Sequence, residues 1–241
     1  MMRIAVLSDV HANLPALDAV LADAGPMDAV WHLGDVVGYG PDPNGVVDRL
    51  RQVGAIGVRG NHDAAAIGDL DIGDFNLDAR AAMEWTRQEI GPATHDWLAA
   101  LPLRREEQGL TLVHGSPRDP TWEYVLSTAI AQANLAAFET PWCLHGHTHV
   151  PIVFRAAGSG MQALGPQSGA VLSLDERRAL LNPGSVGQPR DGIPDSSYLV
   201  LDLDAREASW HRVAYDIGTV QSAMREARLP RPLIERLSLG L

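Results

Sequence analysis

The chain of 241 residues carries a net charge of −11, and 46% of its residues are hydrophobic. This composition is typical of a soluble globular protein that buries a sizeable core. The acidic balance argues against a broad, nonspecific nucleic-acid surface, which needs clustered Lys and Arg. Phosphate substrates stay open, because bound cations would reverse the sign of the charge locally.

The expected compartment follows from the cysteine content and from the apolar runs. Cys143 is the only cysteine, so no internal disulfide can form and the chain suits a reducing compartment. The apolar run Ile4–Leu7 is too short for the core of a signal peptide, and no stretch approaches the length of a membrane span. We therefore expect a cytoplasmic protein without a membrane partner, in which Cys143 is a small buried residue.

The first 63 residues alternate short apolar runs with helical patterns. This alternation predicts parallel strands joined by right-handed crossovers, and ligands of such sheets collect beyond the carboxyl ends of the strands. Asn13 is the expected cap of the first helix. The predicted strands are Ile4–Leu7, Ala29–Leu33 and Ile56–Val58, and the predicted helices are Leu14–Ala24 and Val46–Val53.

The rest of the chain predicts a small helical subdomain over residues 64–101 and then a second sheet. Within the subdomain, Asn76 is the expected cap of a helix that ends at Gly91-Pro92, and a short helix covers Asp96–Leu101. The spacing around Asp175-Glu176 predicts a hairpin. We infer one domain over residues 1–241. The later strands are Leu110–Val113, Trp142–Leu144, Ile152–Phe154, Ala170–Leu174, Arg178–Leu181, Ser197–Leu203 and Ala208–Val213, and the later helices are Thr128–Phe138, Ile217–Ala227 and Leu233–Leu237.

Five short polar motifs stand at the ends of apolar runs. Alone, each is weak evidence: an Asp-x-His pair has roughly one chance in ten of binding metal, and His114 alone is more often a satisfied loop or core histidine. Together they gather five of the nine histidines with three Asp and one Asn, and burying so many polar groups unpaired would cost several kcal/mol each. A pair of metal ions would satisfy them all. The motifs are Asp9-x-His11, Gly34-Asp35, Gly60-Asn61-His62-Asp63, His114-Gly115 and Gly146-His147-Thr148-His149.

A paired site with these ligand types attacks phosphate esters. Two cations about 3.5–4 Å apart lower the pKa of a bridging water and clamp the phosphoryl oxygens for in-line attack. Oxygen and imidazole ligands without thiolate favour Mn, and also suit Fe, Zn, Ni or Co. The imidazoles must be neutral to bind, so metal affinity should weaken at acid pH.

The ordered series D-x-H, G-D, G-N-H-[DE], H and G-H-x-H resembles the calcineurin-like metallophosphoesterase superfamily, and the match spans positions 9 to 149 with every motif intact. The resemblance implies an α/β (α+β) fold of two packed mixed sheets flanked by helices. It places Asp9, His11, Asp35 and His149 around the first metal. The second metal would be held by Asp35, Asn61, His114 and His147, so that Asp35 bridges the two.

The same resemblance suggests that His62 protonates the leaving group or stabilises the transition state, and that Asn61 and His62 contact the substrate. Asp63 either orients His62 or caps the helix that follows it, and the sequence leaves both roles open. The segment 182–191 is either a glycine-rich turn or a loop that offers Arg190 to a substrate phosphate. A similar Asn-Pro-Gly-Ser loop occurs in the small prokaryotic phosphodiesterase-like branch of the superfamily, which favours the second reading.

The remaining aromatic and histidine residues carry weaker signals. Tyr39, Trp122 and Tyr124 flank the motif-bearing loops, where packing is the commoner use of an aromatic and a stacking wall for a nucleoside is the alternative. His145 precedes the last motif, and its strand parity points it away from the site. The other histidines, His32, His95 and His211, have no partners by spacing and are expected to be structural or at the surface.

The predicted function is a dinuclear metal-dependent phosphoesterase that hydrolyses a phosphodiester or phosphomonoester by attack of metal-bound hydroxide. The expected substrate is a small phosphoester or a nucleotide, while a protein phosphatase and a dinucleoside polyphosphate hydrolase are alternatives within the enzyme class. The sequence leaves homo-oligomerisation open. A non-catalytic interaction scaffold is the competing hypothesis, because a retromer subunit with a similar fold serves as a platform. The complete ligand set counts against a scaffold.

Overall fold

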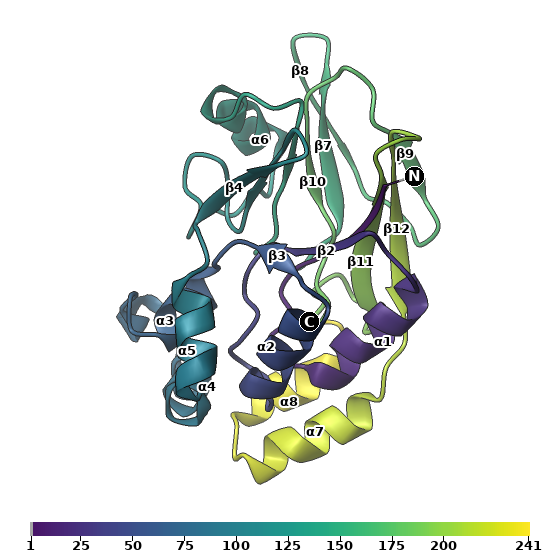
Figure 1. The fold of residues 1–241 in the computed structure, drawn as a ribbon. Helices are drawn as coiled ribbons and strands as arrows, with labels where there is room; N and C mark the ends of the chain where they lie inside the picture. Colours follow the sequence, from purple (N-terminus) through teal and green to yellow (C-terminus); the bar gives the residue numbers. More distant parts are fainter. Residues whose placement is uncertain (1) are drawn as a thin grey trace.

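The computed structural model describes residues 2–241, which form two six-stranded mixed sheets packed face to face, with helices outside them (Figure 1). The order of the first sheet is β3-β2-β1-β11-β12-β9, and that of the second is β4-β5-β6-β10-β7-β8. The expected α/β architecture of two packed sheets is confirmed. Within residues 2–241, none of the helices has the length and apolar character that crossing a membrane requires.

In the first sheet, β1, β2 and β3 are parallel neighbours, and β11 runs antiparallel to β1. The carboxyl ends of the three parallel strands therefore meet at one edge, where Asp9, Asp35 and Asn61 follow them. The strands of this sheet are β1 (Arg3–Leu7), β2 (Ala29–His32), β3 (Ile56–Gly57), β9 (Val171–Ser173), β11 (Ser196–Asp202) and β12 (Glu207–Val213).

In the second sheet, β5, β6 and β10 are parallel neighbours, while β4, β7 and β8 pair antiparallel to their neighbours. His114 follows β5 and the Gly146–His149 motif follows β6, so the later motifs also lie at strand carboxyl ends. The strands of this sheet are β4 (Arg104–Glu107), β5 (Leu110–Val113), β6 (Trp142–Leu144), β7 (Ile152–Ala157), β8 (Gly160–Leu164) and β10 (Ala179–Asn182).

Two helices, α1 and α4, begin at the caps that the sequence predicts. The side chain of Asn13 accepts a hydrogen bond from the Ala16 N–H (3.2 Å), and that of Asn76 accepts one from the Ala79 N–H (2.9 Å). The helices are α1 (Leu14–Ala24), α2 (Pro43–Gln52), α3 (Asn61–Ala66), α4 (Leu77–Glu89), α5 (Pro92–Ala99), α6 (Thr128–Asn134), α7 (Ile217–Glu226) and α8 (Arg231–Glu235), with 3₁₀ turns η1 (Ile72–Asp74), η2 (Leu135–Ala137) and η3 (Arg236–Ser238).

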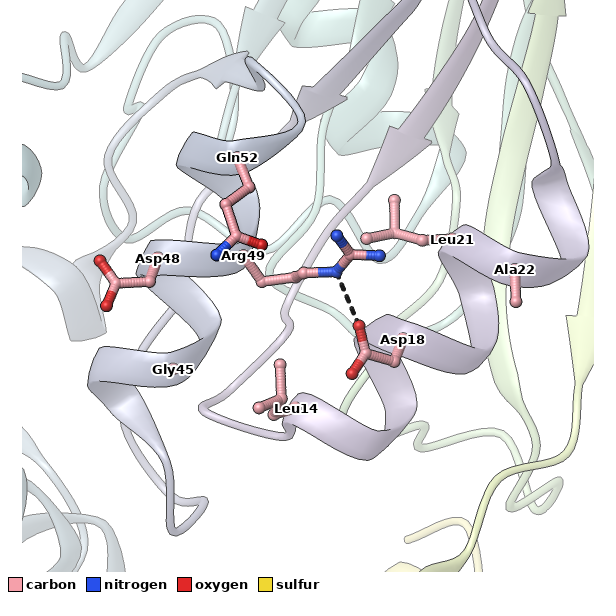
Figure 2. Close-up of a pocket in the computed structure, with 8 residues that line it drawn as sticks. All are labelled: Leu14, Asp18, Leu21, Ala22, Gly45, Asp48, Arg49 and Gln52. Carbon is pink, nitrogen blue, oxygen red and sulfur yellow. Dashed lines mark hydrogen bonds and ion pairs between the residues drawn. The ribbon is translucent and has the colours of Figure 1, made fainter.

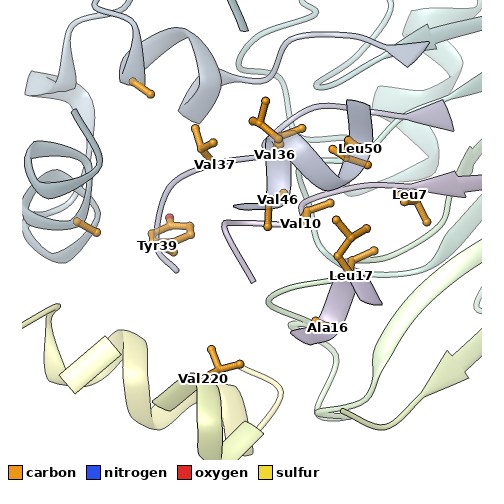
Figure 3. Packing of buried hydrophobic residues seen from close by; sticks show 14 of the residues in the cluster. Leu7, Val10, Ala16, Leu17, Val36, Val37, Tyr39, Val46, Leu50 and Val220 are labelled. Atoms are coloured by element: carbon orange, nitrogen blue, oxygen red, sulfur yellow. The ribbon is translucent and has the colours of Figure 1, made fainter. Parts of the chain in front are cut away.

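Alternate residues of β1 supply two different cores, as the period of a strand requires. Ile4 and Val6 point into the core between the two sheets, whereas Ala5 and Leu7 face the helices that cover the first sheet. Figure 3 shows this second core, in which side chains of α1, α2 and α7 pack with the segment that follows β2. Burial on both faces explains why β1 reads as a continuous apolar run.

The predicted hairpin around Asp175-Glu176 is wrong. β9 pairs with β12 in the first sheet, while β10 pairs with β6 and β7 in the second, so this turn carries the chain from one sheet to the other. Strands β4 and β8 were not predicted from the sequence. β4 consists only of charged residues, Arg104 to Glu107, and lies at the edge of its sheet, where no alternation of polar and apolar residues is needed.

Candidate metal centre

Five of the expected ligands adopt backbone conformations that side chains rarely adopt. Positive φ angles at non-glycine residues cost about 1–3 kcal/mol each and persist where the surroundings enforce them, often at functional sites. The strand ends therefore hold these side chains in directions that a relaxed backbone would not give. The φ angles are 52° at Asp9, 49° at His11, 50° at Asp35, 66° at His147 and 61° at His149.

A first buried group consists of Asp9, His11 and His149, whose ligand atoms all lie within 4.8 Å of one another. The Nε2 atoms of His11 and His149 are 3.1 Å apart, and His149 Nε2 is 3.3 Å from Asp9 Oδ1. The other ring nitrogens contact main-chain carbonyls, His11 Nδ1 at Val37 (3.3 Å) and His149 Nδ1 at Gln188 (2.6 Å). Each Nδ1 must be protonated to donate there, so each Nε2 presents a lone pair to the centre.

A second buried group consists of Asp35, His114 and His147. His114 Nε2 lies 3.0 Å from His147 Nδ1, 3.0 Å from Asn61 Oδ1 and 3.3 Å from Asp35 Oδ2, while His114 Nδ1 donates to the Leu33 carbonyl at 2.8 Å. Burial lowers the pKa of His114, but the Asp35 carboxylate outweighs it and raises the pKa to about 9. Without a cation, a proton on Nε2 holds this group together, and a bound metal would displace it.

Asp35 faces both groups. Its Oδ2 lies 3.8 Å from His11 Nε2 and 3.3 Å from His114 Nε2, and its Oδ1 accepts a hydrogen bond from the His62 backbone N–H at 2.8 Å. The carboxylate is therefore fixed by the backbone on one side and open to both histidines on the other. This geometry suits a ligand shared by two ions.

The two groups fit divalent cations. Within residues 2–241, Asp9 Oδ1 and His147 Nε2 are buried without a hydrogen-bond partner. Burial also lowers the pKa of His11 well below its ordinary value, and it lowers the pKa of His149, so both imidazoles are neutral as metal ligands must be. Converging lone pairs and carboxylates repel one another until a cation lies between them. Each group could hold one ion.

His62 is buried beside the first group, packed among rings. Its ring centre lies 4.3 Å from that of Tyr39, 4.9 Å from that of Phe75 and 5.0 Å from that of His11. Burial lowers the pKa of His62 to about 4, with Arg190 acting in the same direction and Asp35 opposing both. The imidazole is therefore neutral at pH 7. Its Nδ1 is buried and has no hydrogen-bond partner within residues 2–241.

Asp63 has the role of a helix cap. Its Oδ2 accepts from the Gly60 N–H at 3.0 Å, and its Oδ1 accepts from the Val36 N–H at 2.8 Å and the Val37 N–H at 3.1 Å. Of the two roles that the sequence left open, the bond from Gly60 is that of a helix cap. The bonds from Val36 and Val37 hold the loop after β2 in place. Both carboxylate oxygens are engaged by the backbone, so the hydrogen bonds support the cap, and the catalytic role of Asp63 stays a prediction.

The segment 182–191 supports the metal-binding loops from behind. Ser185 Oγ donates to the Asp9 carbonyl at 2.8 Å, and the Gly187 N–H donates to the same oxygen at 3.0 Å. Asn182 Nδ2 donates to the Gly146 carbonyl at 2.8 Å. The supporting roles of Asn182 and Ser185 were not predicted from the sequence, because their partners become neighbours only through the tertiary fold. The Asn-Pro-Gly-Ser run was the available signal.

Arg190 lies at the end of this segment, next to the first group. Its backbone N–H donates to the His149 carbonyl at 3.4 Å, and its guanidinium carbon is 5.9 Å from the centre of the Tyr39 ring. The side chain donates from Nη2 to Gln188 Oε1 at 3.2 Å, while the buried Nε has no partner within residues 2–241. The guanidinium is thus available to an anion at the centre.

The structure separates the aromatic residues of the predicted stacking wall. Tyr124 stacks on His147, with ring centres 3.8 Å apart and an angle of 23° between the planes. Trp122 instead packs edge-on against Phe75, which in turn contacts His62. Tyr39 is buried between His11 and His62. The covered faces of Tyr124 and Tyr39 are therefore closed to a nucleoside base.

The residues expected to lie outside the site do so. His145 is buried against Asn182, and His32 is buried near Trp97. Neither belongs to the two ligand groups. Cys143 is buried, and burial raises the pKa of its thiol, as expected for an inert residue.

A surface groove of about 680 Å³ lies apart from the metal-binding motifs, between α1 and α2 (Figure 2). An ion pair between Arg49 Nε and Asp18 Oδ1 (2.7 Å) crosses it. None of the expected ligands lines this groove, so it is separate from the candidate centre. Its lining residues are Leu14, Asp18, Leu21, Ala22, Gly45, Asp48, Arg49 and Gln52.

Comparison with known families agrees with this geometry. The profile of the calcineurin-like phosphoesterase superfamily domain matches residues 2–206. The chain belongs to this superfamily. The calcineurin-like phosphoesterase match covers both sheets up to the turn before β12, and it includes all five motifs.

Several known proteins are similar to most of the chain. The uncharacterized protein MJ0912 of Methanocaldococcus jannaschii is 36% identical over 245 residues, which cover 98% of each chain. Phosphodiesterase YfcE of Escherichia coli is 30% identical over 217 residues, 85% of this chain and 89% of its own. The crystal structure of a metallophosphoesterase from Sphaerobacter thermophilus superposes with a TM-score of 0.91 at 46% identity, covering 100% of this chain and 99% of that one.

Proposed function

We propose that the protein is a dinuclear metal-dependent phosphoesterase that hydrolyses small phosphodiesters or phosphomonoesters. The observation that carries the proposal is the pair of buried Asp and His groups that both face Asp35 and turn their ring nitrogens toward one another. Membership of a phosphoesterase superfamily and the similarity to a phosphodiesterase support the same reaction class.

The proposed ligands are seven of the residues in the five motifs. Asp9, His11 and His149 hold the first ion and Asn61, His114 and His147 the second, with Asp35 shared. When bound, the two ions supply an activated water and neutralise charge on the phosphoryl group. The donors are oxygen and imidazole nitrogen, which favours Mn and also suits Fe, Zn, Ni or Co.

His62 is the proposed proton donor to the substrate. Its backbone N–H holds Asp35, so the imidazole is fixed relative to the proposed shared ligand. In the free protein the ring is neutral at pH 7 because its pKa is about 4, and a neutral imidazole still donates one hydrogen bond. A phosphate beside it adds negative charge, which favours the protonated ring and hence proton transfer to a leaving oxygen.

Arg190 and Asn61 are the proposed substrate contacts. The Arg190 guanidinium pairs with no carboxylate within residues 2–241. It lies near the Tyr39 ring, and the Arg190 backbone N–H donates to the carbonyl of the proposed ligand His149. A planar guanidinium with free donors binds phosphate oxygens in a forked arrangement. It is therefore suited to the oxygens that face away from the metal ions.

The test compares the turnover of bis-p-nitrophenyl phosphate and p-nitrophenyl phosphate by Mn-loaded protein, with EDTA-treated protein as the control. We expect metal-dependent turnover that is higher for the diester. A preference for the monoester would redirect the search to phosphoproteins and small monoesters. Absence of turnover of either ester by protein with both metals bound would contradict the proposal and favour the scaffold hypothesis.

A further inference from the structure

Tyr124 packs against the candidate metal centre but is partly exposed to solvent. One face of its ring stacks on His147, yet 39% of the residue's surface stays accessible to solvent. The residue therefore borders both the second ligand group and the solvent from which a substrate arrives. None of the roles proposed above uses it.

The loop that carries Tyr124 is held firmly. Glu123 accepts hydrogen bonds from Ser116 Oγ at 2.6 Å and from Asn134 Nδ2 at 2.8 Å, and it pairs with Arg118. The Gly115 N–H donates to the Pro120 carbonyl at 2.8 Å, which closes the loop on itself. The ring of Tyr124 is thus placed by the fold, and stacking on His147 fixes its plane.

The hydroxyl hydrogen of Tyr124 is left to donate, because the Arg190 guanidinium donates to the hydroxyl oxygen. The hydroxyl therefore lies beside the guanidinium that is proposed to contact the substrate phosphate, at the edge of the second ligand group. A base cannot stack on the ring face that His147 covers. A phenol next to a guanidinium, at the edge of a site for anions, is suited to donate a hydrogen bond to an anionic oxygen.

We propose that Tyr124 is a further substrate-binding residue, whose hydroxyl donates a hydrogen bond to the same phosphoryl oxygens that Arg190 contacts. The inference rests on the proposed function. It assigns the two donors to the oxygens that the metal ions leave free, with Arg190 supplying charge and Tyr124 a neutral donor of fixed direction. A neutral second donor adds affinity without a further cation beside Arg190.

The test uses Tyr124→Phe, which removes the hydroxyl and keeps the ring on His147. We expect kcat/KM for bis-p-nitrophenyl phosphate to fall roughly tenfold or more, the usual scale for a hydrogen bond to a charged group. The matched control is Tyr198→Phe, which removes a hydroxyl that donates to Asp23 Oδ2 (2.6 Å) away from the centre, and it should stay within about twofold of the wild type.

Two further measurements on the same variants make the outcome decisive. Isothermal titration calorimetry of inorganic phosphate on Mn-loaded protein should show weaker binding by Tyr124→Phe, and this readout holds even if no ester is turned over. Metal content by mass spectrometry should equal that of the wild type. Unchanged kcat/KM and phosphate affinity would overturn the proposal, as would a loss of metal that accounts for the whole effect, since Tyr124 would then merely support His147.

Discussion

His11 and His149 present their Nε2 atoms to each other at 3.1 Å, while their Nδ1 atoms contact the carbonyls of Val37 and Gln188. If both Nδ1 atoms carry a proton, no hydrogen bond can join the two Nε2 atoms. The contact is then repulsive in the metal-free protein and becomes attractive once a cation accepts both lone pairs. A buried ligand pair of this kind couples metal binding to folding.

Metal removal should therefore lower thermal stability. A ligand that binds only the folded state at 100 times its dissociation constant stabilises by about 2.7 kcal/mol, so filling the proposed sites should raise the melting temperature by several degrees. Differential scanning calorimetry with EDTA, and then with added Mn, measures the effect. The variant His95→Gln, which changes an exposed histidine on α5, should show the same metal-dependent shift as the wild type. Equal melting temperatures with and without metal would refute the proposed centre.

Removing the proposed proton donor should reduce catalysis without releasing metal. His62→Gln keeps the backbone N–H that Asp35 accepts, and it deletes only the imidazole. General acid catalysis contributes about 10²–10⁴-fold, so kcat should fall by that order while metal content stays at the wild-type level. Steady-state kinetics and metal analysis of the same preparation decide the matter, and a variant with wild-type kcat would remove His62 from the reaction.

Removing the neighbouring carboxylate, Asp63, should instead lower stability. Asp63→Ala leaves the backbone N–H groups of Gly60, Val36 and Val37 without their acceptor in a buried region. The free energy of unfolding should fall by about 3 kcal/mol or more, because each unsatisfied buried group costs about 1–3 kcal/mol. Urea denaturation measures the loss. A drop in activity without a drop in stability would instead support the catalytic role.

The Glu123 network gives a pH dependence whose sign follows from the pKa. The Arg118 guanidinium and the hydrogen bonds from Ser116 and Asn134 lower the pKa of Glu123 from 4.5 to about 2. A lowered folded-state pKa means that the stabilisation is complete above about pH 4.5 and is lost as the pH falls toward 2. Glu123→Gln should cost about 1 kcal/mol at pH 7. Denaturant unfolding at a series of pH values should show the difference from wild type shrinking below pH 4.5, and a constant difference down to pH 2 would contradict the assignment.

The sequence predicts which side chains gather at one place better than it predicts the sheets around them. Asp9, Asp35 and Asn61 each follow an apolar run, and parallel strands bring such positions together whatever their distance along the chain. The hairpin expected at Asp175-Glu176 is wrong because the pairing of strands cannot be deduced from the local sequence. A short turn between two strands has the same local pattern whether the strands pair with each other or join different sheets.

Contacts that only the tertiary fold creates could not be predicted from the sequence. Tyr124 and His147 are far apart in the chain, and nothing in either segment indicates that their rings stack. The two roles of Asp63 could not be separated either, because an Asp three residues after Gly60 suits a cap and a catalytic pair equally well. Only the position of Val36 and Val37 next to that carboxylate distinguishes them.

The left-handed backbone at Asp9, His11, Asp35, His147 and His149 bears on whether such a centre could be moved to another protein. These side chains take their directions from bends that two sheet edges enforce on each other, through bonds such as that from the Gly187 N–H to the Asp9 carbonyl. If the seven proposed ligands were grafted onto ordinary helices or strands, their side chains would point in diverging directions. A transfer of the centre would therefore have to include the pair of facing sheet edges. Copying the ligands alone would be easy but would not rebuild the centre.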